Sequence, residues 1–321
     1  MSKANRTTIL KGAAIIKSGE LVAFPTETVY GLGADGLNPI AVAKIFEVKR
    51  RPSFNPLILH IAKKSDLAKF TYYKDTRIDK LIDSFWPGPL TLVLPKKNIV
   101  PDIVTSGNET VAIRMPNHKV ALDLIKQSGV PIAAPSANKF GNLSPTDATH
   151  VYKSLGESIE LIIDGGKCNV GLESTIIEVR DKEIILLRPG GLSKEEIENS
   201  VGKIKIRRIL KAKPNSPGQL PYHYSPSVPL YFLNSTSANK FRSSIVGVIY
   251  FKKVNANYSF SNFKVLSPKG DLRVAAANLF KFLHEFENKK VDVILVEPIK
   301  EKGLGLAIMD RLKKGSKKYS H

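Results

Sequence analysis

Three cations and an asparagine stand close together in the segment 49–55, whose sequence is KRRPSFN. Lys49 offers a compact ammonium group, Arg51 a planar fork of donors and Asn55 a neutral amide, which together could clamp the oxygens of a phosphate chain. The same cations could instead stabilise the negative end of the helix that precedes them. The segment by itself leaves both interpretations open.

Hydroxyl groups follow the first predicted strand in the segment 25–33, PTETVYGLG. Its glycines allow the backbone to approach a ligand closely, and Thr26, Thr28 and Tyr30 could hydrogen-bond to one. We therefore expect a loop here, although on this segment alone a structural turn is a better interpretation than a binding site. His60, at the end of a later strand, is likewise expected to be structural.

Two further strand ends carry polar groups. Arg114 could hold a carboxylate through two parallel hydrogen bonds, or it could belong to a surface ion pair. In the segment AAPSAN, Ser136 and Asn138 follow small residues that leave space for a ligand. The glycine-rich stretch 165–175 and Arg188 add a hydroxyl pair and a cation. Because the chain has no GxxxxGK[ST] segment, a conventional P-loop is excluded.

Strands alternate with helices over the first two thirds of the chain, which is typical of an α/β domain. A helix is predicted from Pro39 to about Lys49, since Asn38 is a good N-cap and proline suits the first helical position. The apolar runs that we predict as strands lie at 21–24, 56–61, 91–94, 111–115, 131–134, 161–164, 174–179 and 183–187.

Five prolines between 214 and 229 are too close together for a helix or a central strand. We therefore predict a first domain at 1–208, a proline-rich linker or lid at 209–229 and a second α/β domain at 230–321. The linker contains QLPYHYS, an unusually aromatic sequence for a spacer. In the second domain we predict strands at 230–233, 245–251 and 291–296 and a last helix at 304–314.

The composition is that of a globular protein. A chain of 321 residues exceeds the roughly 250–300 that one core supports, which favours two domains. With 42% hydrophobic and 24% charged residues, disordered and fibrous classes are excluded. We find no signal peptide and no apolar run of the ~18–20 residues that span a bilayer. The lone Cys168 excludes an internal disulfide, suits the reducing cytoplasm and is expected to be buried.

The net charge of +20 is concentrated in the last third of the chain. Up to Lys205 there are 28 cationic and 22 acidic residues, a surplus of 6; from Ile206 onward there are 21 and 7, a surplus of 14. Such a field attracts polyanions such as nucleotides or RNA. A basic proteome or a need for solubility would give the same count.

These motifs, in this order, resemble those of the YrdC-like threonylcarbamoyl-AMP synthases, in the longer form that carries a C-terminal domain. The similarity covers nearly the whole chain and includes PTETVYGLG, FWPGPLTLVL and the RPG at 188–190. It also includes the family's signature tetrad, at Lys49, Arg51, Ser136 and Asn138. The resemblance implies an α/β fold with a twisted mixed sheet and flanking helices, followed by a smaller Rossmann-like domain.

The activity that the resemblance implies is nucleotidyl transfer. L-threonine, bicarbonate and ATP would give L-threonylcarbamoyladenylate and pyrophosphate, and a downstream complex would use the product to modify adenosine beside the anticodon of certain tRNAs. Magnesium is expected to accompany ATP, with its protein ligands unassigned. Direct binding of tRNA and the role of the C-terminal domain stay open.

The resemblance also implies roles for individual residues. Lys49 and Arg51 would be catalytic, through stabilisation of charge on the phosphates. The ATP site would consist of Lys49, Arg51, Asn55, Thr110, Ser136, Asn138, Ser144, Arg188 and, from the linker beside His223, Tyr224. Arg114 would take the carboxylate of threonine in a site formed by Thr28, His60, Arg114, Ala134 and Ser174.

Two rival functions remain. The first is an RNA-binding module without nucleotidyl transfer, since residues that clamp phosphates also suit a nucleic-acid backbone. The second is a carbamoyl-transfer enzyme that uses carbamoyl phosphate, because related domains occur in such proteins. The chain lacks their zinc-finger and kinase-like segments, which disfavours the second rival.

Overall fold

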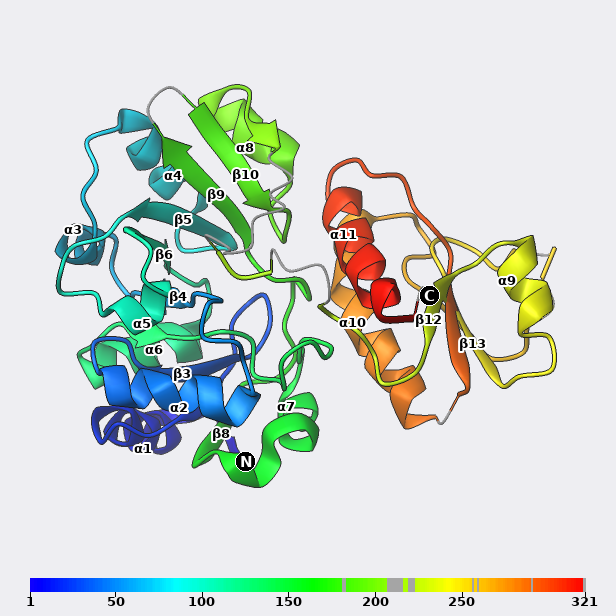
Figure 1. Ribbon diagram of the computed structural model, residues 1–321, viewed down its shortest axis with the longest axis horizontal. Helices are drawn as coiled ribbons and strands as arrows, with labels where there is room; N and C mark the ends of the chain where they lie inside the picture. Colours follow the sequence, from blue (N-terminus) through cyan, green and yellow to red (C-terminus); the bar gives the residue numbers. More distant parts are fainter. Residues whose placement is uncertain are drawn as a thin grey trace.

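The computed structural model describes residues 1–180, 183–206, 216–218, 223–255, 257–258, 260–289 and 291–319. The parts 209–215 and 219–222 of the predicted linker therefore lie outside the described residues. Figure 1 shows two bodies side by side, with the N-terminal strands and helices in one and the elements after the linker in the other. None of the helices described is both long and apolar enough to cross a membrane.

Within the described residues, the first body is built on a mixed sheet with the order β1-β8-β2-β3-β7-β4-β6-β5-β9-β10-β11. Parallel pairs such as β4 with β6 alternate with antiparallel pairs such as β5 with β6. The strands are β1 (Ser2–Lys3), β2 (Val22–Phe24), β3 (Gly31–Asp35), β4 (Ile58–His60), β5 (Leu90–Pro95), β6 (Thr110–Arg114), β7 (Ile132–Ala133), β8 (Leu161–Asp164), β9 (Thr175–Arg180), β10 (Glu183–Arg188) and β11 (Lys205–Ile206).

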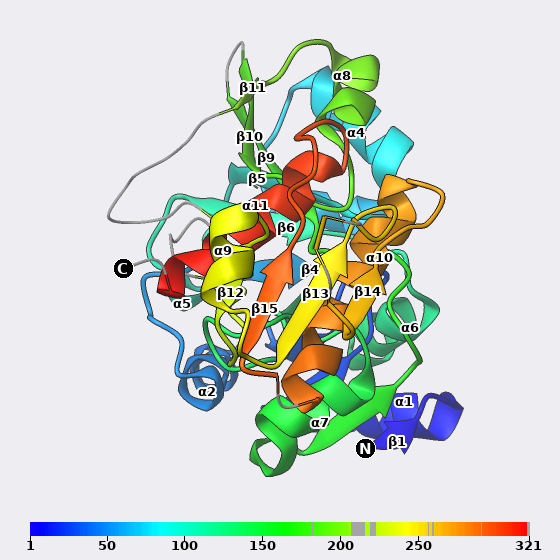
Figure 2. The same ribbon diagram turned by 90° about the vertical axis from the view of Figure 1, so that its right-hand side faces the viewer.

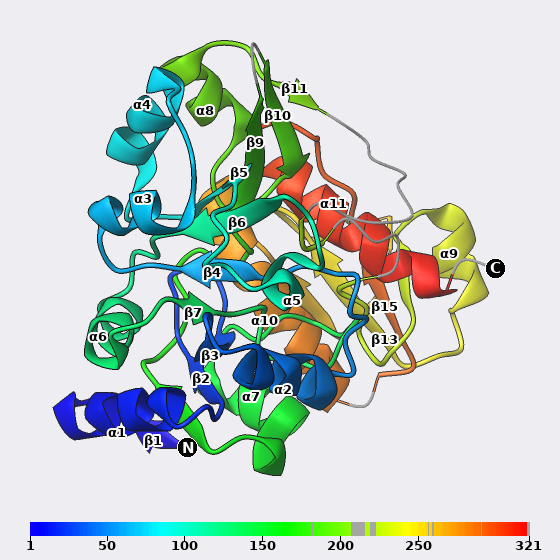
Figure 3. The same cartoon turned by 60° about the vertical axis from the view of Figure 1, so that its left-hand side comes forward.

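Helices cover this sheet on both faces. Ile16 of α1 and Leu124 of α6 form one apolar core against Ile163 of the sheet, while Ile45 of α2 and Leu81 of α4 belong to the larger core. Figure 3 shows α4 and α8 together at one end of the sheet and α1 at the other. The helices are α1 (Arg6–Lys17), α2 (Pro39–Lys49), η1 (Lys64–Asp66), α3 (Leu67–Phe70), α4 (Thr76–Phe85), α5 (Asp102–Thr105), α6 (Lys119–Ser128), α7 (Ala148–Leu155), η2 (Gly156–Ser158) and α8 (Lys194–Val201).

The second body is a smaller parallel sheet with the order β12-β15-β13-β14. Figures 1 and 2 show α10 and α11 on the face of this sheet that meets the first body, with α9 on the other side. A buried apolar core joins both helices to the sheet. The elements are β12 (Leu230–Phe232), α9 (Ser235–Lys240), β13 (Val246–Tyr250), β14 (Phe263–Val265), α10 (Leu272–Asn288), β15 (Val293–Val296), α11 (Gly305–Ser316) and η3 (Lys317–Tyr319).

The α/β fold and the predicted strands are confirmed, but the predicted loop at 25–33 is wrong in its second half. Residues Gly31–Asp35 form β3, which pairs with β2 and β7 in the middle of the sheet. A Cβ atom at Gly33 would lie only 2.7 Å from side-chain atoms of Phe24 and of Ile132. The glycines thus serve close packing between strands, a use that the sequence does not distinguish from a turn. The short strands β1, β11 and β14 were also not predicted.

The C-terminus of α2 places two cationic side chains inside the protein and the one between them on the surface. Arg50 adopts a left-handed conformation, with φ of 51°, and ends the helix. Its side chain is exposed, whereas the side chains of Lys49 and Arg51 on either side are buried, with 1% and 7% of their surface exposed. The turn therefore places two of the three cations inside the protein.

We expect replacement of Asn38 by alanine to lower the free energy of unfolding of the first domain by about 1 kcal/mol. The side chain of Asn38 accepts hydrogen bonds from the backbone N–H groups of Ile40 and Ala41, and alanine would leave both donors without a partner. Unfolding in urea, followed by fluorescence of the single, buried Trp86, measures the change. Asn38→Asp keeps the capping oxygen and should stay within a few tenths of a kcal/mol of the wild type; equal losses in both variants would contradict this account of the helix start.

Candidate active site

A cavity of about 50 Å³ lies between the strand ends of the first domain and the described parts of the linker. Its wall includes Pro217 and Gly218, and His223 further along the linker. Nine of the fourteen predicted site residues line the cavity, namely Thr28, Arg51, His60, Arg114, Ala134, Ser136, Ser174, Arg188 and Tyr224. Residues that are far apart in the sequence are thus brought to one place.

Lys49 lies directly behind this wall. Its ammonium group donates hydrogen bonds to the backbone carbonyls of Ser136, at 2.7 Å, and of Asn138. Burial, together with the charge of nearby Arg51, lowers the pKa of Lys49 well below its usual value. An ammonium has three donors, so one remains for an incoming anion.

Four other predicted residues lie outside the wall, and one of them, Asn138, donates through its side-chain amide to Lys139 O and Asn142 O. Asn55 accepts a hydrogen bond from Arg51 Nε through its backbone carbonyl, while its buried side-chain amide finds no partner among the described residues. Ser144 donates to the carboxylate of Glu173, which lines the cavity. Thr110 is half-buried at the start of β6, at the opposite end of the strand from Arg114, and the structure does not bring it to the cavity.

The two arginines of the expected phosphate side are anchored by main-chain carbonyls. Arg51 Nη2 donates to Pro56 O at 2.8 Å, and Arg188 Nη2 donates to Ser174 O at 2.8 Å and to Ser174 Oγ at 3.0 Å. Burial lowers the pKa of Arg51 to about 9. Tyr224 acts against this shift, and the charge of Arg188 adds to it. Burial likewise lowers the pKa of Arg188. Because the carbonyls that hold Arg51 and Arg188 are neutral, the positive charges of both arginines can still attract an anion.

The threonine residues of the 25–30 loop form a relay of hydroxyl groups. Thr26 Oγ1 donates to Val29 O at 2.7 Å, and Thr28 Oγ1 lies 2.8 Å from Thr26 Oγ1. Since the Thr26 proton is already used, Thr28 must be the donor in the second contact. The lone pairs of Thr28 therefore remain free to accept a hydrogen bond inside the cavity.

His60 is neutral in this site. Its Nδ1 lies 3.2 Å from Ile58 O and 3.3 Å from Ile132 O, and because carbonyls only accept, this nitrogen must carry the proton. Burial and the neighbouring charge of Arg114 lower the pKa of His60 to about 3. The other ring nitrogen is then an acceptor in a pocket wall, so the prediction of a purely structural histidine does not describe its position.

Arg114 has a partner that sequence reasoning missed. Its Nη2 lies 2.7 Å from Glu27 Oε1 in a buried ion pair without an aligned hydrogen bond, and its Nε donates to Gly88 O at 3.1 Å. The alternative of a surface ion pair is therefore wrong, because both side chains are less than 10% exposed. Of the five N–H donors of the guanidinium, only that of Nε is used by a hydrogen bond to the described residues, so donors remain for a substrate carboxylate, with Nη1 free of the ion pair. Nothing in the sequence marks Glu27 as the partner of Arg114, because Glu27 lies in a motif dominated by hydroxyl groups.

Tyr224 closes the cavity from the linker. It has a left-handed backbone, with φ of 65°, only 1% of its surface is exposed, and its hydroxyl finds no partner among the described residues. Burial raises its pKa to about 12, despite the opposing charge of Arg311. A Cβ atom at Gly218 would lie 2.8 Å from Tyr224 Oη and 2.8 Å from Arg188 Cδ. The two described parts of the linker therefore fit tightly over the arginine.

The site holds more positive than negative charge. Lys49, Arg51, Arg114 and Arg188 are all at most 7% exposed. Glu27 and Glu173 bring only two carboxylates among the described residues around the cavity. Such an excess, removed from water, favours a polyanionic ligand.

Comparisons with known proteins agree with this geometry. Two family models match the chain, one described as "Telomere recombination" at residues 14–190 and one as "Threonylcarbamoyl-AMP synthase, C-terminal domain" at residues 192–316. The threonylcarbamoyl-AMP synthase of Pyrococcus abyssi is 46% identical over 95% of this chain and 92% of its own, and that of Bacillus subtilis is 44% identical over 97% and 94%.

A solved structure is equally similar. The crystal structure of P. abyssi Sua5 complexed with L-threonine superimposes with a TM-score of 0.90 and 42% identity, covering 99% of this chain and 97% of that one. Both domains and the linker region are therefore shared with these relatives, and the chain belongs to the threonylcarbamoyl-AMP synthase family, in its two-domain form.

Proposed function

We propose that this chain makes L-threonylcarbamoyl-AMP from L-threonine, bicarbonate and ATP, with release of pyrophosphate, for use by a downstream tRNA-modifying complex in the cytoplasm. The observation that carries the proposal is the enclosed cavity, in which a cluster of buried cations meets a set of neutral hydrogen-bonding groups. The first set suits a triphosphate and the second a small amino acid. Membership of the family supports the same reaction.

On the amino-acid side, Arg114 Nη1 would hold the carboxylate of threonine. Thr28 Oγ1 would accept a hydrogen bond from the ligand, and Ser174 would contact its other polar groups. His60 Nε2 would accept a hydrogen bond from the amine. A neutral histidine does not repel the amine, and a pocket poor in water disfavours the ammonium form. Bicarbonate takes up one proton and loses water to give carbon dioxide. The free amine then attacks carbon dioxide, forms the carbamate C–N bond and releases one proton, so the two steps together balance.

On the phosphate side, the charges would stabilise the second step. A carbamate oxygen forms a bond to the α-phosphorus of ATP, and the bond from this phosphorus to pyrophosphate breaks. Lys49, Arg51 and Arg188 would surround the negative oxygens as charge moves towards the leaving group. The unpaired amide of Asn55 offers a further donor. Since these groups are anchored already, little reorganisation is needed during the reaction.

Magnesium would come with the nucleotide. The described residues contain no group of three or more His, Cys, Asp or Glu side chains that could hold a metal ion. Glu173, the one carboxylate among the described cavity residues, already pairs with Arg311 and Ser144. The side chains therefore do not fit a dedicated magnesium cage, and we propose that the ion is held by phosphates and water.

The first prediction concerns the reaction itself. Pyrophosphate release should require threonine, ATP and bicarbonate together, and carbon from labelled bicarbonate should appear in the product. Omission of threonine should abolish release, and carbamoyl phosphate should not replace bicarbonate plus ATP. Equal release without threonine would exclude the proposed function and favour an unrelated nucleotide hydrolysis.

The second prediction compares two neighbouring arginines. Arg51→Gln should lower kcat/KM for ATP about 100-fold, because it removes one buried charge from the phosphate side. Arg50→Gln is the matched control, since Arg50 is exposed and points away from the cavity wall. An RNA-binding module would instead lose RNA affinity and salt dependence in both variants; that outcome with unchanged adenylation would support the rival.

The third prediction tests whether the linker is a lid. A volume of about 50 Å³ is far below the roughly 300–1,000 Å³ of ordinary ligand pockets, so the closed state must open to admit ATP. Gly218→Ala should weaken ATP binding about tenfold, because the added methyl group would collide with Tyr224 and Arg188 when the lid closes. The binding constant can be measured by titration calorimetry.

Gly202→Ala is the control for this experiment. Gly202 has nearly the same φ as Gly218, 82° against 81°, but a Cβ atom there meets nothing within 4 Å. Both variants therefore place alanine at a positive φ, which strains the backbone, but only Gly218→Ala adds a collision. If they weakened ATP binding equally, the effect would be strain alone and the lid would lose its support.

A further inference from the structure

One carboxylate stands in a cavity wall whose other charged side chains, Arg51, Arg114 and Arg188, are cations. Glu173 lines the cavity with only 6% of its surface exposed, beside Ser174 and close to Arg188. A carboxylate in this position would repel a triphosphate unless another group neutralised it. The nearest predicted ATP residue, Ser144, donates to Glu173 Oε1 but is itself neutral.

The neutralising charge comes from the second domain. Arg311 of α11 is 1% exposed, and its Nε lies 2.7 Å from Glu173 Oε2. Its Nη2 also donates to Pro189 O at 3.0 Å, next to Arg188. Burial alone raises the pKa of Glu173, but Arg311 and Arg188 outweigh it and bring the pKa down to about 2. Arg311 does not line the cavity itself, so it acts through Glu173.

The same face of α11 supports the linker. The guanidinium of Arg311 lies 4.6 Å from the centre of the Tyr224 ring, in a cation–π contact. Lys314, one turn further along, donates to Gly218 O at 2.8 Å. A Cβ atom at Gly315 would lie 2.8 Å from Tyr224 O, so the helix and the linker are in close contact. The two described parts of the linker rest on this helix.

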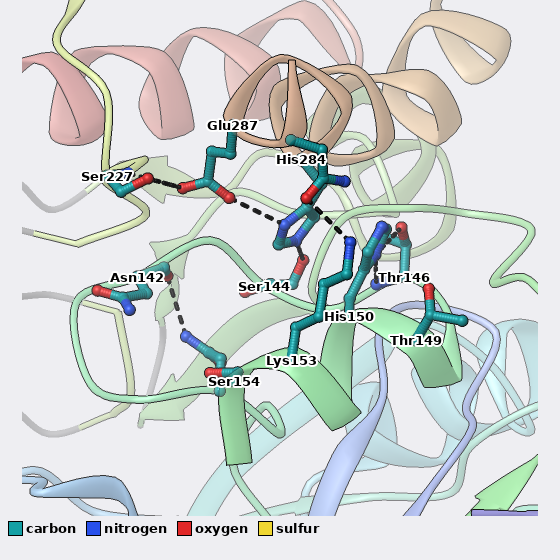
Figure 4. Close-up of polar contacts among 12 residues, drawn as sticks. Asn142, Ser144, Thr146, Thr149, His150, Lys153, Ser154, Ser227, His284 and Glu287 are labelled. Carbon is teal, nitrogen blue, oxygen red and sulfur yellow. Dashed lines mark hydrogen bonds and ion pairs between the residues drawn. The ribbon is translucent and has the colours of Figure 1, made fainter. Parts of the chain in front are cut away.

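Helix α10 holds the segment of Ser144 from the other side. His284 Nε2 lies 3.1 Å from Ser144 O, and the His284 ring stacks on His150 at 3.8 Å between centres. Figure 4 shows His284 with Ser144 and His150, and Lys153 beside them. Lys153 Nζ donates to Asn288 Oδ1 at 2.9 Å. The predicted nucleotide residue is thus fixed through its backbone by α10 and through its side chain by the Glu173–Arg311 pair.

We infer that the C-terminal domain completes the nucleotide site by supplying Arg311 as a positioning residue, which neutralises Glu173 and supports the closed linker beneath Tyr224. This inference rests on the proposed function. It assigns the second domain a role in binding the triphosphate of ATP rather than threonine. Without Arg311, the charge of Glu173 would face the phosphates, and the linker would lose the support for its aromatic ring.

The test is a double-mutant cycle on ATP binding, measured by calorimetry with ATP and magnesium in the absence of threonine. Arg311→Met should raise the Kd for ATP at least about tenfold, because it leaves a buried carboxylate unpaired. The Kd for threonine, measured separately, should change less than about twofold. In Glu173→Gln, Arg311 keeps Asp310 as a partner, and ATP should bind at least as tightly as to the wild type.

The double variant Glu173→Gln/Arg311→Met decides between electrostatics and structure. We expect its Kd for ATP to lie between those of Arg311→Met and the wild type, since the repelling charge is gone but the contact of Arg311 with Tyr224 is still missing. It also keeps the test valid if Arg311→Met alone does not fold. Arg273→Met is the control, because Arg273 pairs with Glu196 across the same interface at 3.1 Å but is 80% exposed. Its affinity for ATP should not change.

Three results would overturn the inference: unchanged ATP affinity in Arg311→Met, a loss in the double variant as large as the loss in Arg311→Met, or weaker binding in Glu173→Gln alone. Equal losses of ATP and threonine affinity, with a lower melting temperature, would indicate a merely structural role. If the wild type itself bound no ATP, the proposed function would fail instead. The two failures are therefore distinguishable.

Discussion

The organisation of this protein depends on keeping several cations out of water without giving each one a counter-ion. A buried charge that is neither paired nor hydrogen-bonded is costly. Here main-chain carbonyls solve the problem: those of Ser136 and Asn138 receive Lys49, those of Asn55 and Pro56 receive Arg51, and that of Ser174 receives Arg188. Carbonyl dipoles satisfy the donors but leave the net charge in place, which is what a site for a polyanion requires.

This constraint explains why the site lies where irregular segments meet. Carbonyls inside helices and sheets are already used, so free ones must come from loops and strand ends. The loop at 51–57 and the segments 134–138 and 173–174 supply them. The mixed sheet holds these segments in register, and the two carboxylates, Glu27 and Glu173, each neutralise an arginine that would otherwise be less well oriented. The second domain takes part because one of these arginines belongs to it.

Much of this could be predicted from the sequence, because local signals carry it. Asn38 and Pro39 define the start of α2, and the apolar runs locate the strands. Contacts across the fold could not be predicted. Glu27 and Glu173 resemble ordinary surface acids in the sequence, and Arg311 resembles a cation on an amphipathic helix. The prediction of a loop at Gly33 is wrong because the packing of this glycine against Phe24 produces no pattern in the neighbouring sequence. The motif at 49–55 gave the residue types, but which of its cations face inward depends on one left-handed residue.

The pairing of Glu173 with Arg311 has a consequence for the order in which the protein is made. Translation delivers Glu173 first and Arg311 only 138 residues later (311 − 173). At roughly 5–20 residues per second, that interval lasts on the order of ten seconds. During this time the first domain can fold on the ribosome with its acid exposed to the empty pocket. A nascent chain would therefore hold nucleotide poorly until helix α11 emerges and docks.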